Sequence, residues 1–169
     1  MTFTAPVLTT PRLRLRMLEA QDFEDYAAIH TDFEATRYTA RTQLTRMGAW
    51  RHMAMLVGHW HLRGFGMWGV EELATGRIAG RVGFHEPEGW PGFELGWTIG
   101  REFWGKGYAT EAARAALDHA FGEMNRDHVI SLIDPENVKS IAVAERIGET
   151  LESEIDVDGY RLLVYGIRR

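Results

Sequence analysis

Two glycines separated by a single lysine form the segment whose residue types bear most directly on chemistry. Gly105-Lys106-Gly107 lies between a predicted strand and an alanine-rich stretch that is typical of a helix. Glycine has no Cβ, so the backbone can turn sharply there and approach a ligand closely. The first amides of the following helix have no partners within the helix, and the helix dipole favours negative charge at that end. The segment therefore predicts a site for an anionic group such as a phosphate.

The loop matches neither of the two common nucleotide-binding fingerprints. Residues 105–110 read GKGYAT, which lacks the spacing GxxxxGK[ST] and does not stand in a parallel strand–helix–strand unit, as GxGxxG requires. On residue types alone, a tight strand-to-helix turn without any ligand is an equal alternative.

The composition is that of one globular domain. The chain has 169 residues, of which 45% are hydrophobic and 25% are charged, and no repeat or linker divides residues 1–169. The sequence contains no cysteine, which excludes a disulfide scaffold, a thiolate zinc site and a cysteine nucleophile. No apolar run approaches the ~20 residues of a membrane span. The net charge of −5 argues against a nucleic-acid partner. No signal-peptide pattern precedes Thr9, so the cytoplasm is the expected compartment.

The elements that must position the loop follow from hydrophobic periodicity and turn residues. Strands are expected at 12–18, 67–73, 77–85, 93–99, 128–133, 151–157 and 161–167. Helices are expected from an N-cap at Asp22, over 43–60, over 111–121, and from the turn 134–137 to a C-cap at Gly148. The short gap at 74–76 predicts a hairpin within an antiparallel meander. The pattern indicates an α+β fold, in which helices flank a largely antiparallel central sheet of about seven strands.

Three segments in this order resemble the GNAT superfamily of acetyl-CoA-dependent N-acetyltransferases, in particular its ribosomal-protein N-terminal (RimJ/RimL-like) branch. Trp104–Ala112 is similar to the pyrophosphate loop R/Q-x-x-G-x-G/A, with Trp104 at the first position. Glu94–Ile99 resembles the central strand of that branch. Asp134–Ser140 resembles the start of the N-x-x-S/A helix, which here ends with Glu149 in place of a phenylalanine. The likeness covers nearly the whole chain and implies the mixed sheet of that superfamily.

The resemblance implies a binding site for acetyl-CoA. The amides of residues 105–110 would hold the pyrophosphate, with Lys106 and Arg101 as counter-charges or as plain solvated side chains. The pantetheine arm would pair like an extra strand where two strands splay apart beside residues 97–99. Asn137 matches a pantetheine contact, and it is equally suited to cap the following helix. The cofactor-binding candidates are Trp97, Thr98, Ile99, Gly105, Lys106, Gly107, Tyr108, Ala109, Thr110, Asn137 and Ser140.

Acetyl transfer requires a general base, because an amine with a pKa of about 10.4 is protonated at neutral pH. Glu94, at the start of the central strand, is the first candidate. Alternation places it with Gly96 and Thr98 on one face of the strand, opposite Trp97. The alternative for Glu94 is a solvent-exposed carboxylate. His85, with an unperturbed pKa of about 6.5, is the competing base.

The departing thiolate needs a hydrogen-bond donor. Many superfamily members use a tyrosine seven residues after the asparagine, and this chain has Ala144 at that position. Ser140, three residues after Asn137, is the expected substitute, and Tyr108 is a weaker one. A backbone amide near Trp97 is expected to stabilise the oxyanion. Because the chain has no cysteine, we expect direct attack in a ternary complex.

The sequence leaves the acceptor open among a protein N-terminus, a polyamine, an antibiotic amine and an amino acid. In this superfamily early helices shape the acceptor cleft, so Trp50, Met53 and Trp60 are expected to wall it. His59 and His61 alternate without a third ligand at metal-site spacing, so no metal is expected. A homodimer through the terminal strands is a further expectation. The alternative function is an acyl-CoA-binding or sensor domain without activity, because the usual tyrosine is missing.

Overall fold

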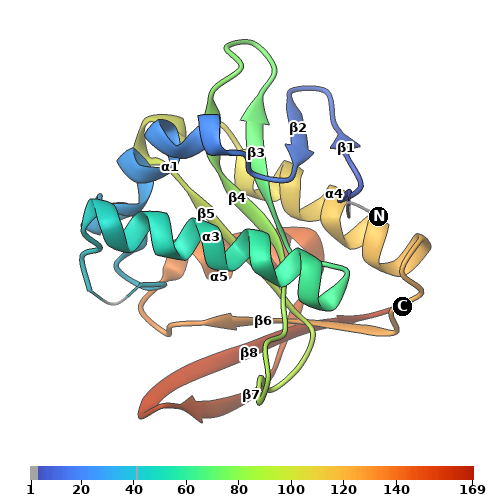
Figure 1. The fold of residues 1–169 in the computed structure, drawn as a ribbon. Coiled ribbons are helices and arrows are strands. Elements are labelled where there is room, and N and C mark those ends of the chain that lie inside the picture. Colours follow the sequence, from blue (N-terminus) through green and yellow to red (C-terminus); the bar gives the residue numbers. More distant parts are fainter. Residues whose placement is uncertain (1–3, 41) are drawn as a thin grey trace.

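The computed structural model describes residues 4–40 and 42–169 and arranges them around one sheet of eight strands (Figure 1). The strand order is β1-β2-β3-β4-β5-β6-β8-β7, and every neighbouring pair is antiparallel except β5 and β6. The strands are β1 (Leu8–Thr9), β2 (Leu13–Arg16), β3 (Met67–Glu72), β4 (Ile78–His85), β5 (Glu94–Ile99), β6 (His128–Ile133), β7 (Thr150–Val157) and β8 (Tyr160–Arg168). The predicted α+β fold is confirmed. The additional strand, β1, has two residues and is too short to leave a periodic pattern.

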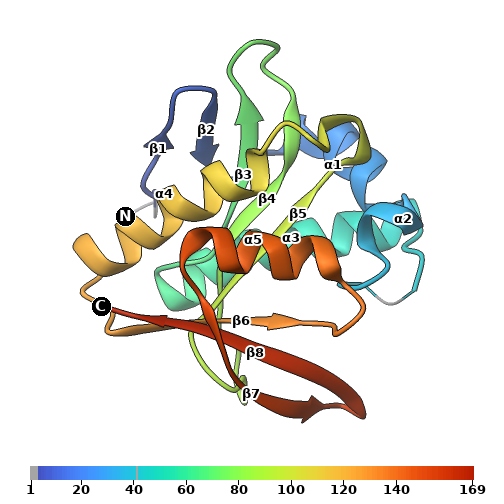
Figure 2. The same ribbon diagram turned by 180° about the vertical axis from the view of Figure 1, so that it is seen from behind.

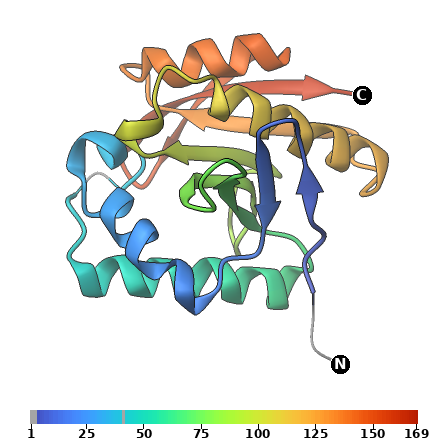
Figure 3. The ribbon, with the colours of Figure 1, turned by 90° about the horizontal axis from the view of Figure 1, so that it is seen from above.

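Helices cover both faces of this sheet. They are α1 (Phe23–His30), α2 (Phe33–Thr36), α3 (Arg46–Arg63), α4 (Tyr108–Gly122) and α5 (Val138–Ile147), with short 3-10 turns at Ala20–Asp22 and Arg101–Phe103. Seen from above, α1 and α3 lie on one side of the sheet and α4 and α5 on the other (Figure 3). In the part of the chain that the structure describes, no helix has both the length and the apolarity to cross a membrane.

The helix α4 begins three residues earlier than its predicted start at Glu111, directly after Gly107. Its predicted inward face is correct: Ala112, Ala113, Ala116, Leu117 and Ala120 are at most 4% exposed. Small alanine side chains let the helix backbone lie close to the sheet. The glycine loop is therefore joined to the helix without any intervening residue.

Spacings of three and four along α3 place Met47, Trp50, Met53, Ala54 and Val57 on one face. In the structure, Met47 and Trp50 of this face are 62% and 54% exposed. The buried side chains are instead Ala49, Met53, Leu56, His59 and Trp60. Apolar residues lie on two neighbouring stripes of this helix, and packing against α1 and β3 buries the stripe that contains Trp60. Periodicity alone cannot choose between two such stripes.

The sheet opens between its two parallel strands. β5 and β6 pair at a single position, Glu94 with Ile130, and the ladder does not continue beyond it. In Figure 1, β6, β8 and β7 run across the lower part of the molecule at a large angle to β3, β4 and β5. From behind, α4 and α5 lie over the region where the strands diverge (Figure 2). This divergence leaves a gap between β5 and β6.

Candidate active site

The backbone of β5 presents hydrogen-bonding groups to the gap between β5 and β6. The Phe93 carbonyl accepts from the Ile130 amide at 3.1 Å, and the Ile99 carbonyl accepts from the Trp104 indole N–H at 2.7 Å. Backbone groups of alternate residues point to the same side of a strand. Trp97 lies midway along this series, so its N–H and C=O face the gap where β6 has turned away. This geometry suits an amide-bearing chain that adds to the exposed strand edge.

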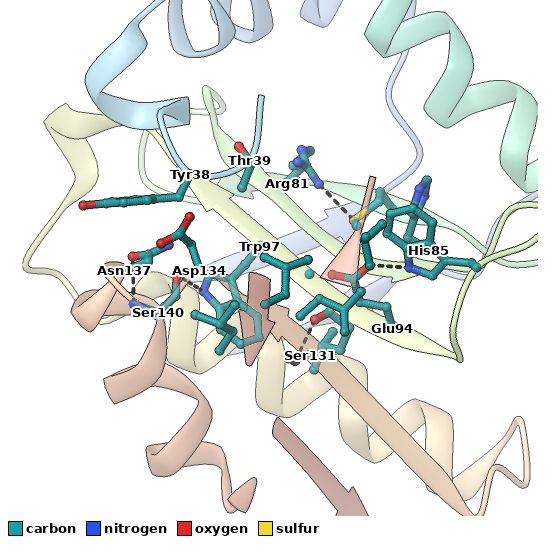
Figure 4. Close-up of a pocket in the computed structure, with 18 of the residues that line it drawn as sticks. Tyr38, Thr39, Arg81, His85, Glu94, Trp97, Ser131, Asp134, Asn137 and Ser140 are labelled. Carbon is teal, nitrogen blue, oxygen red and sulfur yellow. Dashed lines mark hydrogen bonds between the residues drawn. The ribbon is translucent and has the colours of Figure 1, made fainter. Parts of the chain in front are cut away.

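A cavity of about 350 Å³ occupies this gap (Figure 4). It is lined by residues from both faces of β5, because Glu94 and Gly96 point to one face and Leu95 and Trp97 to the other. The cavity therefore joins the α1–α3 side of the sheet to the α5 side. Residues of the α2–α3 loop and of the β7–β8 hairpin close its outer end, among them Tyr38, Thr39, Val157, Asp158 and Tyr160.

Glu94 lies half-buried in the wall of this cavity rather than in open solvent. Burial raises the pKa of its carboxyl from 4.5 to about 7, against the opposing effects of a hydrogen bond from Trp90, the positive charge of Arg81 and the backbone at Leu132. The Trp90 indole N–H donates to Glu94 Oε2 at 2.7 Å, which fixes the position of the side chain. A carboxylate with this pKa is suited to accept a proton at neutral pH.

His85, the competing base, lies opposite Glu94 in the register of β4 and β5. Its ring packs between Trp90, with centroids 5.0 Å apart, and His59, with centroids 5.4 Å apart. Burial and nearby positive charge lower its pKa to about 4. His85 is therefore neutral at pH 7 and a weaker base than Glu94, although both line the same cavity.

Ser140 and Asn137 line the cavity from the α5 side. The Trp97 indole N–H donates to Ser140 Oγ at 3.2 Å. Because the serine oxygen is the acceptor in this bond, its hydroxyl hydrogen can be donated to another group. Asn137 caps α5, because its Oδ1 accepts from the Ser140 amide at 3.2 Å. The cap fixes the start of α5, and with it the serine, at the gap (Figure 4).

The glycine loop has the backbone that its sequence predicts. Gly105 and Gly107 have φ of +77° and +79°, a conformation that L-residues rarely adopt. The first hydrogen bond of α4 runs from the Glu111 amide to the Gly107 carbonyl at 3.0 Å. The amides of Tyr108, Ala109 and Thr110 therefore precede the hydrogen-bonded turn and form the positive end of the helix. The loop is open to solvent, and its donors fit a pyrophosphate.

Two loop side chains are tied to a neighbouring strand rather than free. Lys106 Nζ lies 3.0 Å from Glu72 Oε1, and the Tyr108 hydroxyl donates to the same oxygen at 2.6 Å. Hydrogen bonds from Tyr108, Thr75 and Lys106 lower the pKa of Glu72 to about 2. The phenol of Tyr108 thus braces the loop against β3. Arg101, the other expected counter-charge, pairs with Asp32.

Thr98 and Ile99, two more of the candidates, lie in β5 with different surroundings. Thr98 is 4% exposed, and its register partner is Arg81 of β4. Its side chain points away from the gap, and its hydroxyl has no hydrogen-bond partner. Ile99 faces the core, and its carbonyl is already bonded to Trp104.

Of the two alternating histidines on α3, His59 and His61, the first has a structural role. Its Nδ1 bonds the Phe65 carbonyl at 2.8 Å and its Nε2 accepts from the Glu86 amide at 3.2 Å. Both ring nitrogens of His59 thus bond the backbone around β3 and β4. Of the residues expected to wall the acceptor cleft, Trp50 and Met53 line a separate groove on the other side of α3. His52, Met55 and Leu56 line the cavity instead.

Three polar residues of the site were not among the candidates from the sequence. Arg81 is 8% exposed on β4, Ser131 is 1% exposed on β6, and Glu149 is 2% exposed after α5. The Ser131 hydroxyl lies 2.8 Å from the Leu95 carbonyl and 2.9 Å from Glu149 Oε1, so it bridges the strands where the ladder stops. Burial raises the pKa of Glu149 to about 8. The one available signal was the replacement of the superfamily's phenylalanine by Glu149.

Comparison with known proteins identifies the family and the fold. The family described as acetyltransferase (GNAT) domain matches residues 12–150. The chain is 31% identical over 136 residues to a protein of Bacillus licheniformis named uncharacterized N-acetyltransferase p20, covering 79% of this chain and 76% of that one. It is similar to the crystal structure of an acetyltransferase from Agrobacterium tumefaciens, with 34% identity, a TM-score of 0.87, and coverage of 100% of this chain and 98% of the other.

A third similarity concerns the RimJ branch. The structure of Mycobacterium smegmatis RimJ in complex with CoA-disulfide has a TM-score of 0.77 and 20% identity, over 98% of this chain and 87% of that chain. At this identity the likeness confirms the shared fold. The resemblance of the three sequence motifs to the GNAT superfamily is thus confirmed. The chain belongs to the GNAT acetyltransferase family and is an N-acetyltransferase, an enzyme whose acetyl donor is acetyl-CoA.

Proposed function

We propose that this enzyme transfers the acetyl group to a primary amine by direct attack while acetyl-CoA and the amine are bound together. The observation that carries the proposal is the position of Glu94. A carboxyl with a pKa of about 7 lines a cavity that opens through the sheet beside the exposed backbone of Trp97. The acceptor is a protein N-terminus or a small-molecule amine.

The donor would be held by backbone groups more than by side chains. The amides after Gly107 would bind the pyrophosphate, and Trp97 would pair with the pantetheine arm. When bound, acetyl-CoA supplies an activated acetyl thioester. Gly105 and Gly107 leave the loop surface free of side chains, and Lys106 is held at its edge by Glu72.

Glu94 would remove a proton from the incoming ammonium. At pH 7 about half of the Glu94 carboxyl is ionised, given its pKa of about 7. The amine reaches the acetyl carbonyl from the α1–α3 side of the cavity, where Glu94 lies. A carboxylate in this wall accepts the proton either directly or through one water.

Two donors would stabilise the charge that develops during transfer. The Trp97 N–H faces the gap and would donate to the carbonyl oxygen as it becomes negative. The Ser140 hydroxyl would donate to the departing sulfur, since its oxygen already accepts from the Trp97 indole. Neither Ser140 nor any cysteine forms an acetylated enzyme in this proposal.

A thiol-release assay with acetyl-CoA over a panel of amines tests this function. We expect release of CoA that depends on the amine, and a kcat about 10-fold lower in Ser140→Ala, because one hydrogen bond to a charged group is lost. The rise in melting temperature caused by CoA should be the same in both proteins. Ser153→Ala, on the exposed strand β7, is the control and should have the wild-type kcat.

Two outcomes of this assay would contradict the proposal. A domain that senses acyl-CoA without catalysis would show the rise in melting temperature and no thiol release with any amine. An unchanged kcat in Ser140→Ala would exclude the serine as the donor to sulfur. The homodimer through the terminal strands stays a prediction, and the mass of the protein in solution tests it.

A further inference from the structure

A buried arginine stands in the wall of the acceptor side of the cavity. Arg81 lies on β4, is 8% exposed, and lines the cavity on the same face of the sheet as Glu94. In Figure 4 its side chain rises between Thr39 and His85. Gly83 and Gly96 stand opposite each other in register between Arg81 and Glu94, and the Met67 side chain covers this stretch, since a Cβ on Gly96 would lie 3.0 Å from Met67 Cε.

The guanidinium has only neutral hydrogen-bond partners. Arg81 Nε donates to His30 Nε2 at 3.3 Å, and Nη1 donates to the sulfur of Met67 at 3.4 Å. His30 accepts as a neutral ring, because its Nδ1 is bonded to the Tyr26 carbonyl and burial lowers its pKa well below 6.5. Within the described residues, no carboxylate oxygen lies within 4.0 Å of Arg81.

The titratable groups around Arg81 leave its charge largely uncompensated. His52 bonds the Tyr26 hydroxyl at 2.6 Å, and burial together with Arg81 lowers its pKa to about 3. His85 is also neutral at pH 7. Glu94 lines the cavity on this face and is close enough for the charge of Arg81 to act on its pKa, but it becomes neutral whenever it takes up a proton. Asp134 and Asp158 also line the cavity, and Figure 4 shows Asp134 beside Asn137, away from Arg81.

A buried guanidinium without an anionic partner is costly unless a ligand supplies one. Guanidinium binds carboxylates through two parallel hydrogen bonds, which fixes both the position and the orientation of the ligand. We propose that the acceptor is an amine that also carries a carboxylate, in the manner of an amino acid, and that Arg81 binds this carboxylate. The proposal rests on the proposed function, because it names the substrate class of the same site.

The size and charge of the cavity favour a small acceptor. A volume of about 350 Å³ lies at the low end of ligand pockets, which span about 300–1,000 Å³, and the acetyl end of the donor shares that space. With its carboxylate on Arg81, the amine of such a molecule points past the flexible side chain of Met67 toward Glu94. A polyamine would instead place a second ammonium against the guanidinium.

The test compares each of the twenty L-amino acids with its carboxamide in the thiol-release assay. An amino acid and its carboxamide differ by one charge and have nearly the same shape. For the preferred side chain, we expect kcat/KM to be at least about 10-fold higher for the amino acid, which corresponds to the smaller contribution of a charge-assisted pair. The carboxamide has the more easily deprotonated amine, so the intrinsic reactivity works against this result. Spermidine should be a poor acceptor.

Arg81→Gln should lose the preference. We expect kcat/KM for the amino acid to fall at least about 10-fold, mostly through KM, while kcat/KM for the carboxamide changes little. Arg81→Lys should keep part of the preference. Arg46→Gln, which removes an exposed arginine far from the cavity, is the matched control and should behave as the wild type. An equal melting-temperature shift with CoA in all variants checks that the donor site is intact.

A second measurement keeps the proposal independent of turnover. The same amino acids, added to the complex with CoA, should raise the melting temperature of the wild type and not of Arg81→Gln. Absence of any such rise, a wild-type preference for carboxamides or spermidine, or an equal loss on both members of a pair in Arg81→Gln would overturn the proposal. Binding of amino acids through Arg81 without thiol release would instead contradict the proposed acetyl transfer alone.

Discussion

At the scale of single residues, the buried carboxyl of Glu149 shows how hydrogen-bond counting determines a protonation state. The Ser131 hydroxyl has one hydrogen, yet two acceptors lie within 2.9 Å of its oxygen: the Leu95 carbonyl and Glu149 Oε1. The Leu95 carbonyl can only accept. Ser131 therefore donates to Leu95 and accepts from a protonated Glu149, in agreement with a pKa raised by burial to about 8. This chain of bonds holds β6 to β5 at the point where their ladder ends.

The raised pKa predicts how stability depends on pH. Below about pH 4.5, Glu149 is protonated in both the folded and the unfolded chain, so it adds no pH dependence. Between about 4.5 and 8 the unfolded chain releases this proton while the folded protein retains it, so the free energy of unfolding falls as pH rises. Glu149→Gln should remove much of this slope and stabilise the protein at pH 8 by on the order of a few kcal/mol.

Denaturant unfolding from pH 4 to 9 measures this effect. Glu88→Gln, which removes a fully exposed carboxylate, is the matched control and should keep the wild-type slope. A Glu149→Gln protein whose stability falls between pH 5 and 8 as steeply as that of the wild type would show that Glu149 is ionised in the fold.

Residue type and position predicted some of these groups and not others. Glu94 and Ser140 were predictable, because a central strand and a capped helix place them at fixed points around the gap. The position of Arg81 was not predictable, because an arginine within a strand is usually exposed. Only the tertiary structure shows which helices cover that face of the sheet. The burial of Trp60 in place of Trp50 depends on packing in the same way.

At the scale of elements, the loop and α4 act as one unit. The positive φ of Gly107 lets the chain enter the helix directly, and Tyr108 fixes the loop to β3 through Glu72. The glycine spacing and the alanine face of the helix were enough to predict this unit. The two-residue strand β1 and the short helix α2 were missed, because neither is long enough to show a period.

Gly107→Val tests the unit directly. A β-branched residue is strained at this φ and places a side chain on the face offered to the pyrophosphate. We expect the rise in melting temperature caused by acetyl-CoA to disappear. In the wild type, acetyl-CoA at 100 times its Kd should add about 2.7 kcal/mol to the free energy of unfolding. Gly64→Val, at an equally positive φ of +76° after α3, is the control. Gly64→Val should lower the melting temperature of the free protein and keep the rise caused by acetyl-CoA. A rise of wild-type size in Gly107→Val would show that the loop does not bind the cofactor.

At the scale of the whole molecule, the opening in the sheet creates one cavity that is lined from both faces. The loop and α5 lie on one face, and Arg81, His85 and Glu94 lie on the other. In the proposed reaction both substrates are bound there at once, and the chain has no cysteine to hold the acetyl group between them. Initial rates at varied donor and acceptor should give intersecting double-reciprocal lines. Parallel lines, the mark of an acetylated enzyme, would contradict the ternary complex.

The most direct test of this account is the pH dependence of kcat/KM for the wild type and Glu94→Gln with one acceptor. The wild-type value should rise with pH through an inflection near 7, as Glu94 loses its proton. Glu94→Gln should lack this inflection, be at least about 100-fold slower at pH 7, and recover as the amine itself deprotonates at high pH. A Glu94→Gln enzyme that follows the wild-type profile at every pH would contradict the assignment of Glu94 as the base.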